Sequence, residues 1–283
     1  MFIPSPLCCS GSIDAGTPTG RVEVIGDMEC YVREPDAGVV VTGAVVVCTD
    51  VFGFKVPNVR LIADVFAANG FVAVVPDYLQ RAAVRAELLD AECIVHDREA
   101  TIWQRFQAAM LILWCMPSLL LLMFMRPQLA TAKRVNTLAN QVRTRWGVTH
   151  VGLQGYCYGG GVGILLSQQQ DCHLDAFSVA HPGGLFRIPA DFLKIVKPIH
   201  VVLAETDLQI GPKQRNEMID ALEQVDSLLE GGLLSKVEWF DGVRHGFAVR
   251  GNEQVAHVKQ QREAALTSSI RFLNAAFSKK SSL

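Results

Sequence analysis

Short apolar runs alternate along the chain with segments of helical periodicity. The runs are rich in Val, Ala and Leu, and most lack the polar alternation of a strand with one solvated face. They predict strands over Val22–Ile25, Ala44–Thr49, Phe71–Val75, His150–Leu153, Ala176–Ala180, Ile199–Ala204 and Val237–Phe240. Central strands of a parallel sheet are covered on both faces, so we expect most of these strands to run parallel.

Helices are predicted between the strands. Their apolar residues recur at helical spacing, and several end at a glycine, a common C-terminal cap. The predicted helices are Val59–Asn69, Ala130–Trp146, the segment GVGILLSQQQ (161–170), Lys213–Leu229 and Gln254–Phe277. Strands that alternate with helices form βαβ units, which predicts one mostly parallel α/β domain over 21–278. Residues 1–20, rich in Gly, Ser, Pro and Thr, are predicted to be a tail that lies over this domain.

One segment, 108–125, is uncharged and almost wholly apolar. As a helix it would be about 27 Å long, close to the thickness of a bilayer's hydrocarbon core. Pro117 is expected to break or kink that helix, and a single crossing would separate two halves of one sheet. We therefore expect no transmembrane span. A lid or pocket wall, a buried or homodimer surface, and contact with a membrane surface all remain open.

Composition excludes several classes of protein. Half of the 283 residues are hydrophobic, and 26 basic against 28 acidic residues give a net charge of −2, without a basic stripe for nucleic acid. The eight cysteines show neither disulfide-framework nor zinc-site spacing. Because the N-terminus lacks a secretory pattern, we expect a reducing, cytoplasmic location. Acylation, a partner thiol and ordinary thiols remain open for Cys8 and Cys9.

The strongest local motif is Gly155-Tyr156-Cys157-Tyr158-Gly159, which follows a predicted strand and opens a helix. This context is that of a nucleophile elbow, in which the nucleophile sits on a sharp turn between two small residues. The helix N-terminus would stabilise a thiolate at Cys157. The alternative is a glycine-rich turn around a buried, inert cysteine.

An acid and a histidine follow Cys157 in the order that such folds use. Asp207 comes directly after a predicted strand, and Glu205 is the competing acid. His245 lies in a Gly-flanked loop after the last predicted strand. We predict that His245 is the general base and that Asp207 fixes its tautomer.

The chain resembles the fungal-type branch of the dienelactone hydrolase family, which has an α/β-hydrolase fold. The match lies in CCSG…GTPTGRVE, CTDVFGFKVPNVRLIADVFA, VVPDYL, VGLQGYCYGGG and FDGVRHGFAVRG, with support from AHPGG (180–184) and LAETD (203–207). It covers roughly 21–278, and only about 80–130 resembles a lineage-specific, hydrophobic helical insertion.

The resemblance assigns roles to individual residues. It implies a triad of Cys157, Asp207 and His245, with Asp50, a Glu in the bacterial members, holding the resting thiol. The oxyanion hole would be the backbone amides of Val51 and Tyr158. Arg81 and Arg250 would correspond to the arginines that bind the substrate carboxylate. His181 resembles a wall of the site and receives no catalytic role. Phe52 and Tyr156 are also predicted to bind substrate.

These observations predict a cysteine hydrolase of lactones or small carboxylic esters that works through an acyl-enzyme. Two alternatives remain: a non-catalytic or membrane-associated scaffold that uses 108–125, and a redox-sensing thiol at Cys157. No Walker motif or dinucleotide fingerprint is present, so we expect neither an organic cofactor nor a metal.

Overall fold

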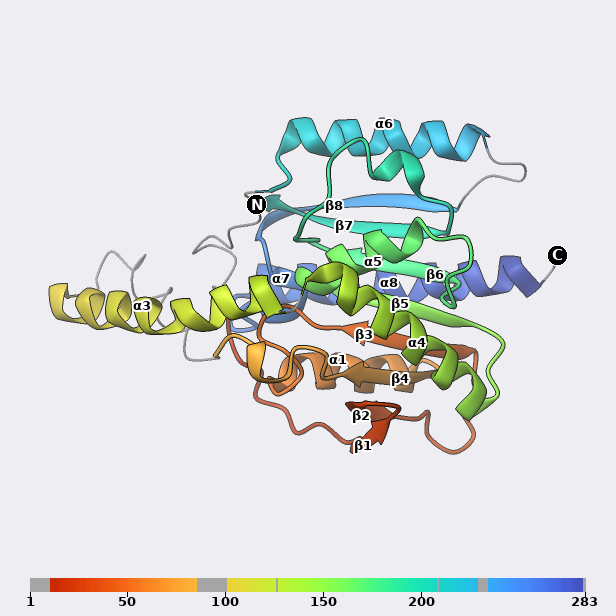
Figure 1. The fold of residues 1–283 in the computed structure, drawn as a ribbon, viewed down its shortest axis with the longest axis horizontal. Helices are drawn as coiled ribbons and strands as arrows, with labels where there is room; N and C mark the ends of the chain where they lie inside the picture. The colour runs from red at the N-terminus through yellow and green to blue at the C-terminus, as the bar shows by residue number, and fades with distance from the viewer. Residues whose placement is uncertain (1–10, 86–100, 126, 208, 229–233, 282–283) are drawn as a thin grey trace.

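The structure, a computed structural model, describes residues 11–85, 101–125, 127–207, 209–228 and 234–281 (Figure 1). Its strands are β1 (Arg21–Ile25), β2 (Met28–Arg33), β3 (Gly43–Cys48), β4 (Phe71–Pro76), β5 (Val151–Tyr156), β6 (Ala176–Ala180), β7 (Ile199–Thr206) and β8 (Ser235–Arg244). Its helices are α1 (Pro57–Ala68), α3 (Ile102–Met125), α4 (Gln128–Trp146), α5 (Tyr158–Ser167), α6 (Pro212–Leu228), α7 (Phe247–Arg250) and α8 (Ala256–Ser281). Two short 3-10 helices are η2 (Gln80–Ala82) and η3 (Phe192–Lys194).

The described strands form one sheet in the order β1-β2-β4-β3-β5-β6-β7-β8. The strands from β4 to β8 in this order run parallel, and β2 pairs antiparallel with both β1 and β4. The mostly parallel α/β-hydrolase fold predicted from the sequence is thereby confirmed. Strand β2 was not predicted.

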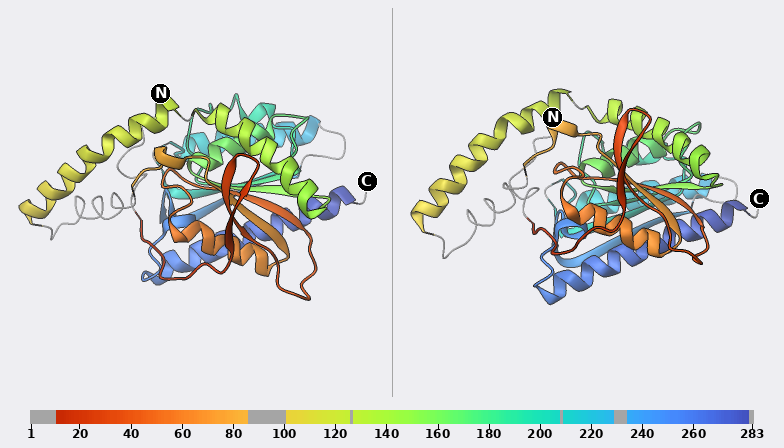
Figure 2. Two further views of the ribbon diagram at one scale, coloured as in Figure 1. Left: turned by 60° about the horizontal axis from the view of Figure 1, so that its bottom comes forward. Right: turned by 90° about the horizontal axis from the view of Figure 1, so that it is seen from below.

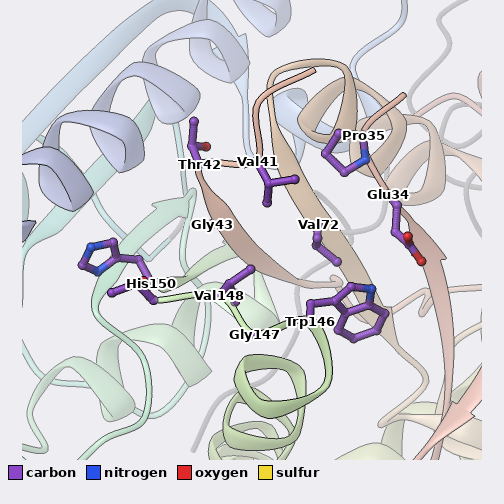
Figure 3. A pocket seen from close by; sticks show the side chains of 11 residues that line it. Glu34, Pro35, Val41, Thr42, Gly43, Val72, Trp146, Gly147, Val148 and His150 are labelled. Carbon is purple, nitrogen blue, oxygen red and sulfur yellow. The ribbon is translucent and has the colours of Figure 1, made fainter. Parts of the chain in front are cut away.

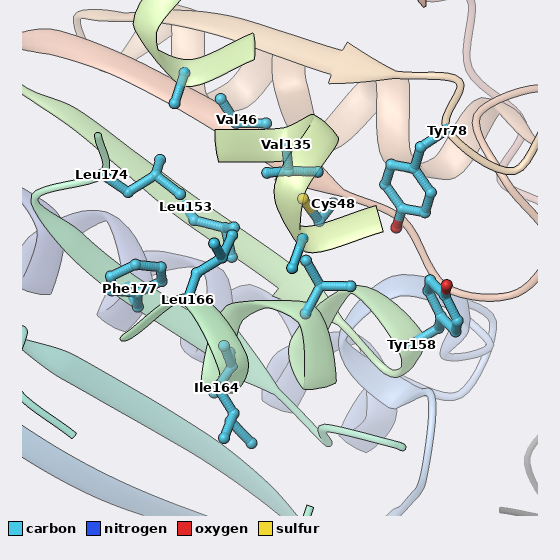
Figure 4. Close-up of a cluster of buried hydrophobic side chains, with 14 of the residues drawn as sticks. Val46, Cys48, Tyr78, Val135, Leu153, Tyr158, Ile164, Leu166, Leu174 and Phe177 are labelled. Carbon is cyan, nitrogen blue, oxygen red and sulfur yellow. The ribbon is translucent and has the colours of Figure 1, made fainter. Parts of the chain in front are cut away.

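Helices cover both faces of the sheet (Figures 1 and 2). Side chains of α4, α5 and α6 share one apolar cluster with alternate residues of the strands, as the close-up in Figure 4 shows for α4 and α5. Side chains of α1, α7 and α8 share the other cluster. In β3, Val46 belongs to the first cluster and Val45 and Val47 to the second, as the period of two in a strand requires. Covering of both faces explains the continuous apolar runs in the sequence.

Helix α3 runs without interruption through Pro117, so of the predicted break or kink the break is wrong. A proline removes one backbone hydrogen bond and crowds one carbonyl, a local cost that the rest of a long helix can absorb. In all views α3 extends away from the body (Figures 1 and 2). Its described exposed apolar side chains are Ile102, Trp103, Phe106, Met110, Leu113 and Trp114. Over the described residues, no helix is both long and apolar enough to cross a membrane.

The described part of the tail, 11–20, lies along α1, α7 and α8. The Ser12 amide donates to the Arg250 carbonyl at 2.8 Å, and Asp14 forms a buried ion pair with Arg262. Thr19 donates from its backbone amide to Asp64 on α1 at 2.8 Å. Cys8 and Cys9 lie outside the described residues.

Candidate active site

The predicted site residues follow neighbouring strands at one edge of the sheet. Cys157 comes directly after β5, His181 after β6, Asp207 after β7 and His245 after β8, and Asp50 lies two residues beyond β3. Because β3, β5, β6, β7 and β8 are adjacent and parallel, their carboxyl ends meet at this edge. The topology therefore gathers residues that are far apart in the sequence.

Cys157 occupies the sharp turn between β5 and α5. Its backbone φ of +47° and ψ of −110° lie outside the regions that residues other than glycine ordinarily adopt. A Cβ at Gly155 would lie 2.5 Å from the Gly159 carbonyl oxygen, and one at Gly159 would lie 2.4 Å from the Cys48 carbonyl oxygen. The two flanking glycines are therefore required by the close approach of the backbone, as a nucleophile elbow demands.

Backbone hydrogen bonds fasten this turn to both neighbouring strands. The Cys157 amide donates to the Ala180 carbonyl at 3.2 Å, and its own carbonyl accepts from Gly183 at 2.8 Å. The Gly159 amide donates to the Thr49 carbonyl at 3.0 Å, which brings the first turn of α5 against the end of β3. The predicted oxyanion-hole residues, Val51 and Tyr158, lie on these two joined segments.

The side chain of Tyr158 packs beside Tyr78 (Figure 4). Its hydroxyl lies 2.9 Å from Thr131 Oγ1, and its ring stacks on Tyr78 with centroids 6.0 Å apart. The oxyanion-hole role of the Tyr158 backbone amide stays a prediction.

His245 and Asp207 are in direct contact, with 2.7 Å between His245 Nδ1 and Asp207 Oδ2. Asp207 Oδ1 accepts from the backbone amides of Gln209 at 2.8 Å and Ile210 at 3.3 Å. Both side chains are almost fully buried. An ionised Asp207 in this position makes Nδ1 the protonated nitrogen and leaves Nε2 as an acceptor.

The competing acid, Glu205, points elsewhere. Glu205 is exposed, and its Oε2 accepts a hydrogen bond from the Gly242 amide at 2.6 Å. Asp207, and not Glu205, is therefore the candidate acid that contacts His245.

His181 lies near both the elbow and His245. The Cys157 amide bonds Ala180, and the next residue, His181, places its ring centroid 4.9 Å from that of His245. His181 is fully buried and has a φ of +37°. Its ring also lies near Tyr156, at 6.0 Å between centroids.

Asp50 and Arg250, predicted for two different tasks, form a buried ion pair with each other. Arg250 Nε donates to Asp50 Oδ2 at 2.5 Å, and the Phe52 amide donates to Asp50 Oδ1 at 3.0 Å. The guanidinium of Arg250 also lies over the Phe52 ring, 5.0 Å from its centroid. The resting-thiol role of Asp50 and the carboxylate-binding role of Arg250 stay predictions. Either role would have to be compatible with the ion pair between the two side chains.

Arg81 and Tyr156 occupy contrasting positions. Arg81 is exposed on η2, after β4, and Tyr156 is buried in the apolar cluster that includes Phe247. Burial raises the pKa of the Tyr156 hydroxyl. A substrate in solvent could therefore contact Arg81, whereas Tyr156 is reached only through the interior of the protein.

Sequence reasoning missed Gln128, the first residue of α4. Its Nε2 donates to the carbonyls of Tyr158 at 3.1 Å and Gly183 at 2.8 Å, and its Oε1 accepts from Leu185 at 3.0 Å. This single amide ties the elbow helix to the loop after β6. Nothing in the local sequence indicates that role, because its partners lie 30 to 57 residues away.

A cavity of about 460 Å³ lies at the other end of the sheet (Figure 3). It is lined by residues such as Glu34, Gly43, Val72, Trp146 and His150, at the amino ends of β3, β4 and β5. The predicted triad follows the carboxyl ends, so this cavity does not serve it. No cluster of His, Cys, Asp and Glu in the described ranges could hold a metal ion.

A histidine between a serine and an acid also lies within the sheet. His200 Nδ1 lies 3.1 Å from Ser178 Oγ, and His200 Nε2 lies 2.7 Å from Glu238 Oε2. Ser178 in the middle of β6 and His200 near the start of β7 are fully buried, and the His200 ring stacks on Phe272 of α8. This contact is structural.

The hydrogen bond from His200, helped by Lys236 and Ser268, lowers the pKa of Glu238 to about 2. The folded pKa is below the unfolded value, near 4.3, so the contact stabilises the fold above that pH and is lost as pH falls towards 2. We expect Glu238→Gln to lower the free energy of unfolding by about 1–2 kcal/mol at pH 6 and by about a quarter of that at pH 2.5, where Glu238 is still largely ionised in the folded state. Urea unfolding across this range measures the difference. An equal loss at every pH would contradict the assignment, and exposed Glu263→Gln is the matched control.

Comparison with known proteins places the chain in a family. The model of the dienelactone hydrolase family matches residues 28–277. The chain is 28% identical to the hydrolase PyvD of Aspergillus violaceofuscus and 26% identical to the carboxymethylenebutenolidase homolog of Mus musculus, each over 96% of both chains. Its fold is similar to that of a dienelactone hydrolase of Anabaena variabilis, with a TM-score of 0.52, 15% identity, and 90% and 97% of the two chains covered. With most of its length matched, the chain belongs to the dienelactone hydrolase family, and this membership supports a hydrolase that acts on ester bonds.

Proposed function

We propose that this protein hydrolyses a lactone or a small carboxylic ester through an acyl-enzyme on Cys157. The observation that carries the proposal is the 2.7 Å contact between His245 and Asp207 at the sheet edge where the strained elbow presents Cys157. A buried acid that fixes a histidine tautomer beside a nucleophile elbow is the arrangement that acyl transfer needs. Packing alone would not require a positive φ at Cys157.

The first half-reaction forms a thioester. His245 Nε2 accepts the thiol proton, and the sulfur of Cys157 attacks the carbonyl carbon of the ester. The amides of Val51 and Tyr158 stabilise the oxyanion that develops. As the carbon–oxygen bond breaks, His245 returns its proton to the leaving oxygen, which in a lactone stays attached to the acyl chain.

The second half-reaction releases the acid. His245 takes a proton from water, the water oxygen attacks the thioester carbon, and the carbon–sulfur bond breaks. The thiolate of Cys157 then recovers a proton from His245, so that ester and water are converted to acid and alcohol. Asp207 stabilises the imidazolium in both halves without itself being protonated.

Mass spectrometry of the acylated protein tests the proposal. With p-nitrophenyl acetate, we expect a burst of p-nitrophenol and an acetyl adduct on the peptide that contains Cys157. Cys157→Ala should lose the adduct and lower turnover by about 10³-fold or more, as loss of a covalent nucleophile does. Cys172→Ala, which removes another buried thiol, is the matched control and should keep both. Unchanged turnover in Cys157→Ala would exclude the mechanism, and a panel of lactones and esters would then define the substrate.

A further inference from the structure

His181 stands at the centre of the proposed site. It follows β6, the strand between β5, which precedes Cys157, and β7, which precedes Asp207. Its backbone amide donates to the Val202 carbonyl at 2.7 Å, which fixes the position of the residue. Its positive φ shows that the chain accepts a backbone conformation unfavourable for a non-glycine residue in order to hold this side chain here.

The His181 ring is fully buried, yet neither of its nitrogens has a hydrogen-bond partner among the described residues. The rings around it belong to Tyr156, His245 and Phe247, with centroids 4.9 to 6.0 Å away. If packing were the only requirement, a phenylalanine would fill this space without a polar group to satisfy. A ligand with hydrogen-bonding atoms would satisfy the nitrogens of His181, and a purely apolar one would not.

A second unpaired atom lies close by. His245 Nε2, the proposed base, is buried and has no hydrogen-bond partner in the described part of the chain. Burial, followed by the nearness of His245 and Arg250, lowers the pKa of His181 well below its usual value. His181 is therefore a neutral imidazole near neutral pH and carries one donor and one acceptor.

We infer that His181 holds the water that hydrolyses the acyl-enzyme, by donating a hydrogen bond to the water oxygen while His245 Nε2 accepts one of its protons. The inference rests on the proposed acyl-enzyme. Water brings the complementary groups, since its oxygen accepts from one imidazole and its O–H donates to the other. Departure of the alcohol leaves room for it beside the thioester.

Hydrolysis of the acyl-enzyme by this water accounts for every proton and bond. The proton goes from water to His245, the water oxygen bonds the acyl carbon, and the bond between the acyl carbon and Cys157 Sγ breaks. The thiolate then recovers the proton from His245. His181 keeps its own proton throughout and acts by orienting the attacking oxygen. It is consequently needed for deacylation and not for attack by the thiol.

Pre-steady-state kinetics with p-nitrophenyl acetate separate the two half-reactions. For His181→Phe, we expect a burst of full amplitude, with its rate within about 3-fold of wild type, followed by a steady-state rate at least about 30-fold lower. Intact-mass spectra should show the acetyl-enzyme persisting after the substrate is exhausted. A purely structural role would lower both rates together.

His181→Gly provides a second, independent measurement, because glycine suits the positive φ and leaves a cavity of imidazole shape. Added imidazole should raise its steady-state rate several-fold, beyond the effect of imidazole on wild type and on Cys157→Ala. An unchanged steady-state rate in either variant, or a parallel loss of burst and steady-state rates in both, would overturn the inference. Absence of a burst and adduct in the wild type would instead overturn the acyl-enzyme itself.

Discussion

Asp207→Asn is expected to lower kcat for a p-nitrophenyl ester by about 10³-fold. In a serine enzyme the equivalent change costs about 10⁴-fold, because asparagine favours the wrong histidine tautomer. A thiol is more acidic than a hydroxyl and depends less on its base, so we expect a smaller loss here. The side chain of Asp207 contacts His245 Nδ1 at 2.7 Å and is buried, so solvent cannot replace it.

The fold should survive this substitution. Asparagine retains an oxygen that can accept from the Gln209 and Ile210 amides, as Asp207 Oδ1 does now. Thermal unfolding monitored by circular dichroism checks this point, and steady-state kinetics measure kcat.

Glu205→Gln is the matched control for Asp207→Asn. Glu205 is also an acid at the carboxyl end of β7, but it accepts from the Gly242 amide instead of His245. We expect its kcat to stay within about 3-fold of wild type, the range usual for a surface substitution away from the reacting groups. If Glu205→Gln lost as much activity as Asp207→Asn, Asp207 would not be the specific partner of His245.

The parallel core of the sheet was predictable because its strands are buried on both faces and therefore leave continuous apolar runs. Strand β2 was missed because its sequence, MECYVR, places Glu29 and Arg33 among the apolar residues. A two-residue connection, Gly26-Asp27, joins β1 to β2 and is a recognisable hairpin signal. Attention to that turn would have found the strand.

The positions of Cys157, Asp207 and His245 could be anticipated because each follows a strand, and parallel strands bring their carboxyl ends together. The pairing of Asp50 with Arg250 could not, since 200 residues separate them and either charge alone is compatible with solvent. The unsatisfied nitrogens of His181 were equally hidden. Whether these nitrogens find a partner depends on which side chains pack around His181, and the local sequence does not predict that packing.

Arg250→Met is expected to lower the free energy of unfolding by about 3–5 kcal/mol, because it leaves Asp50 as a buried carboxylate without its cationic partner. Both side chains are no more than 2% exposed. The Phe52 amide would remain as a hydrogen-bond donor to Asp50, but one neutral donor does not replace a guanidinium. Urea unfolding at pH 7 measures the loss.

The double variant Asp50→Asn with Arg250→Met separates the cost of an orphaned charge from the value of the pair. Burying two charges is itself costly, so the double variant should recover part of what Arg250→Met alone loses. The exposed pair of Arg21 and Glu34 is the matched control, with side chains 53% and 42% exposed, and Arg21→Met should cost no more than about 1 kcal/mol. If the double variant were less stable than Arg250→Met, the pair would not be the reason for the loss. Because Arg250 is buried and paired with Asp50, a substrate carboxylate would have to compete with Asp50 for it. If Arg250 binds such a carboxylate, Arg250→Met should raise KM for anionic esters more than KM for neutral esters.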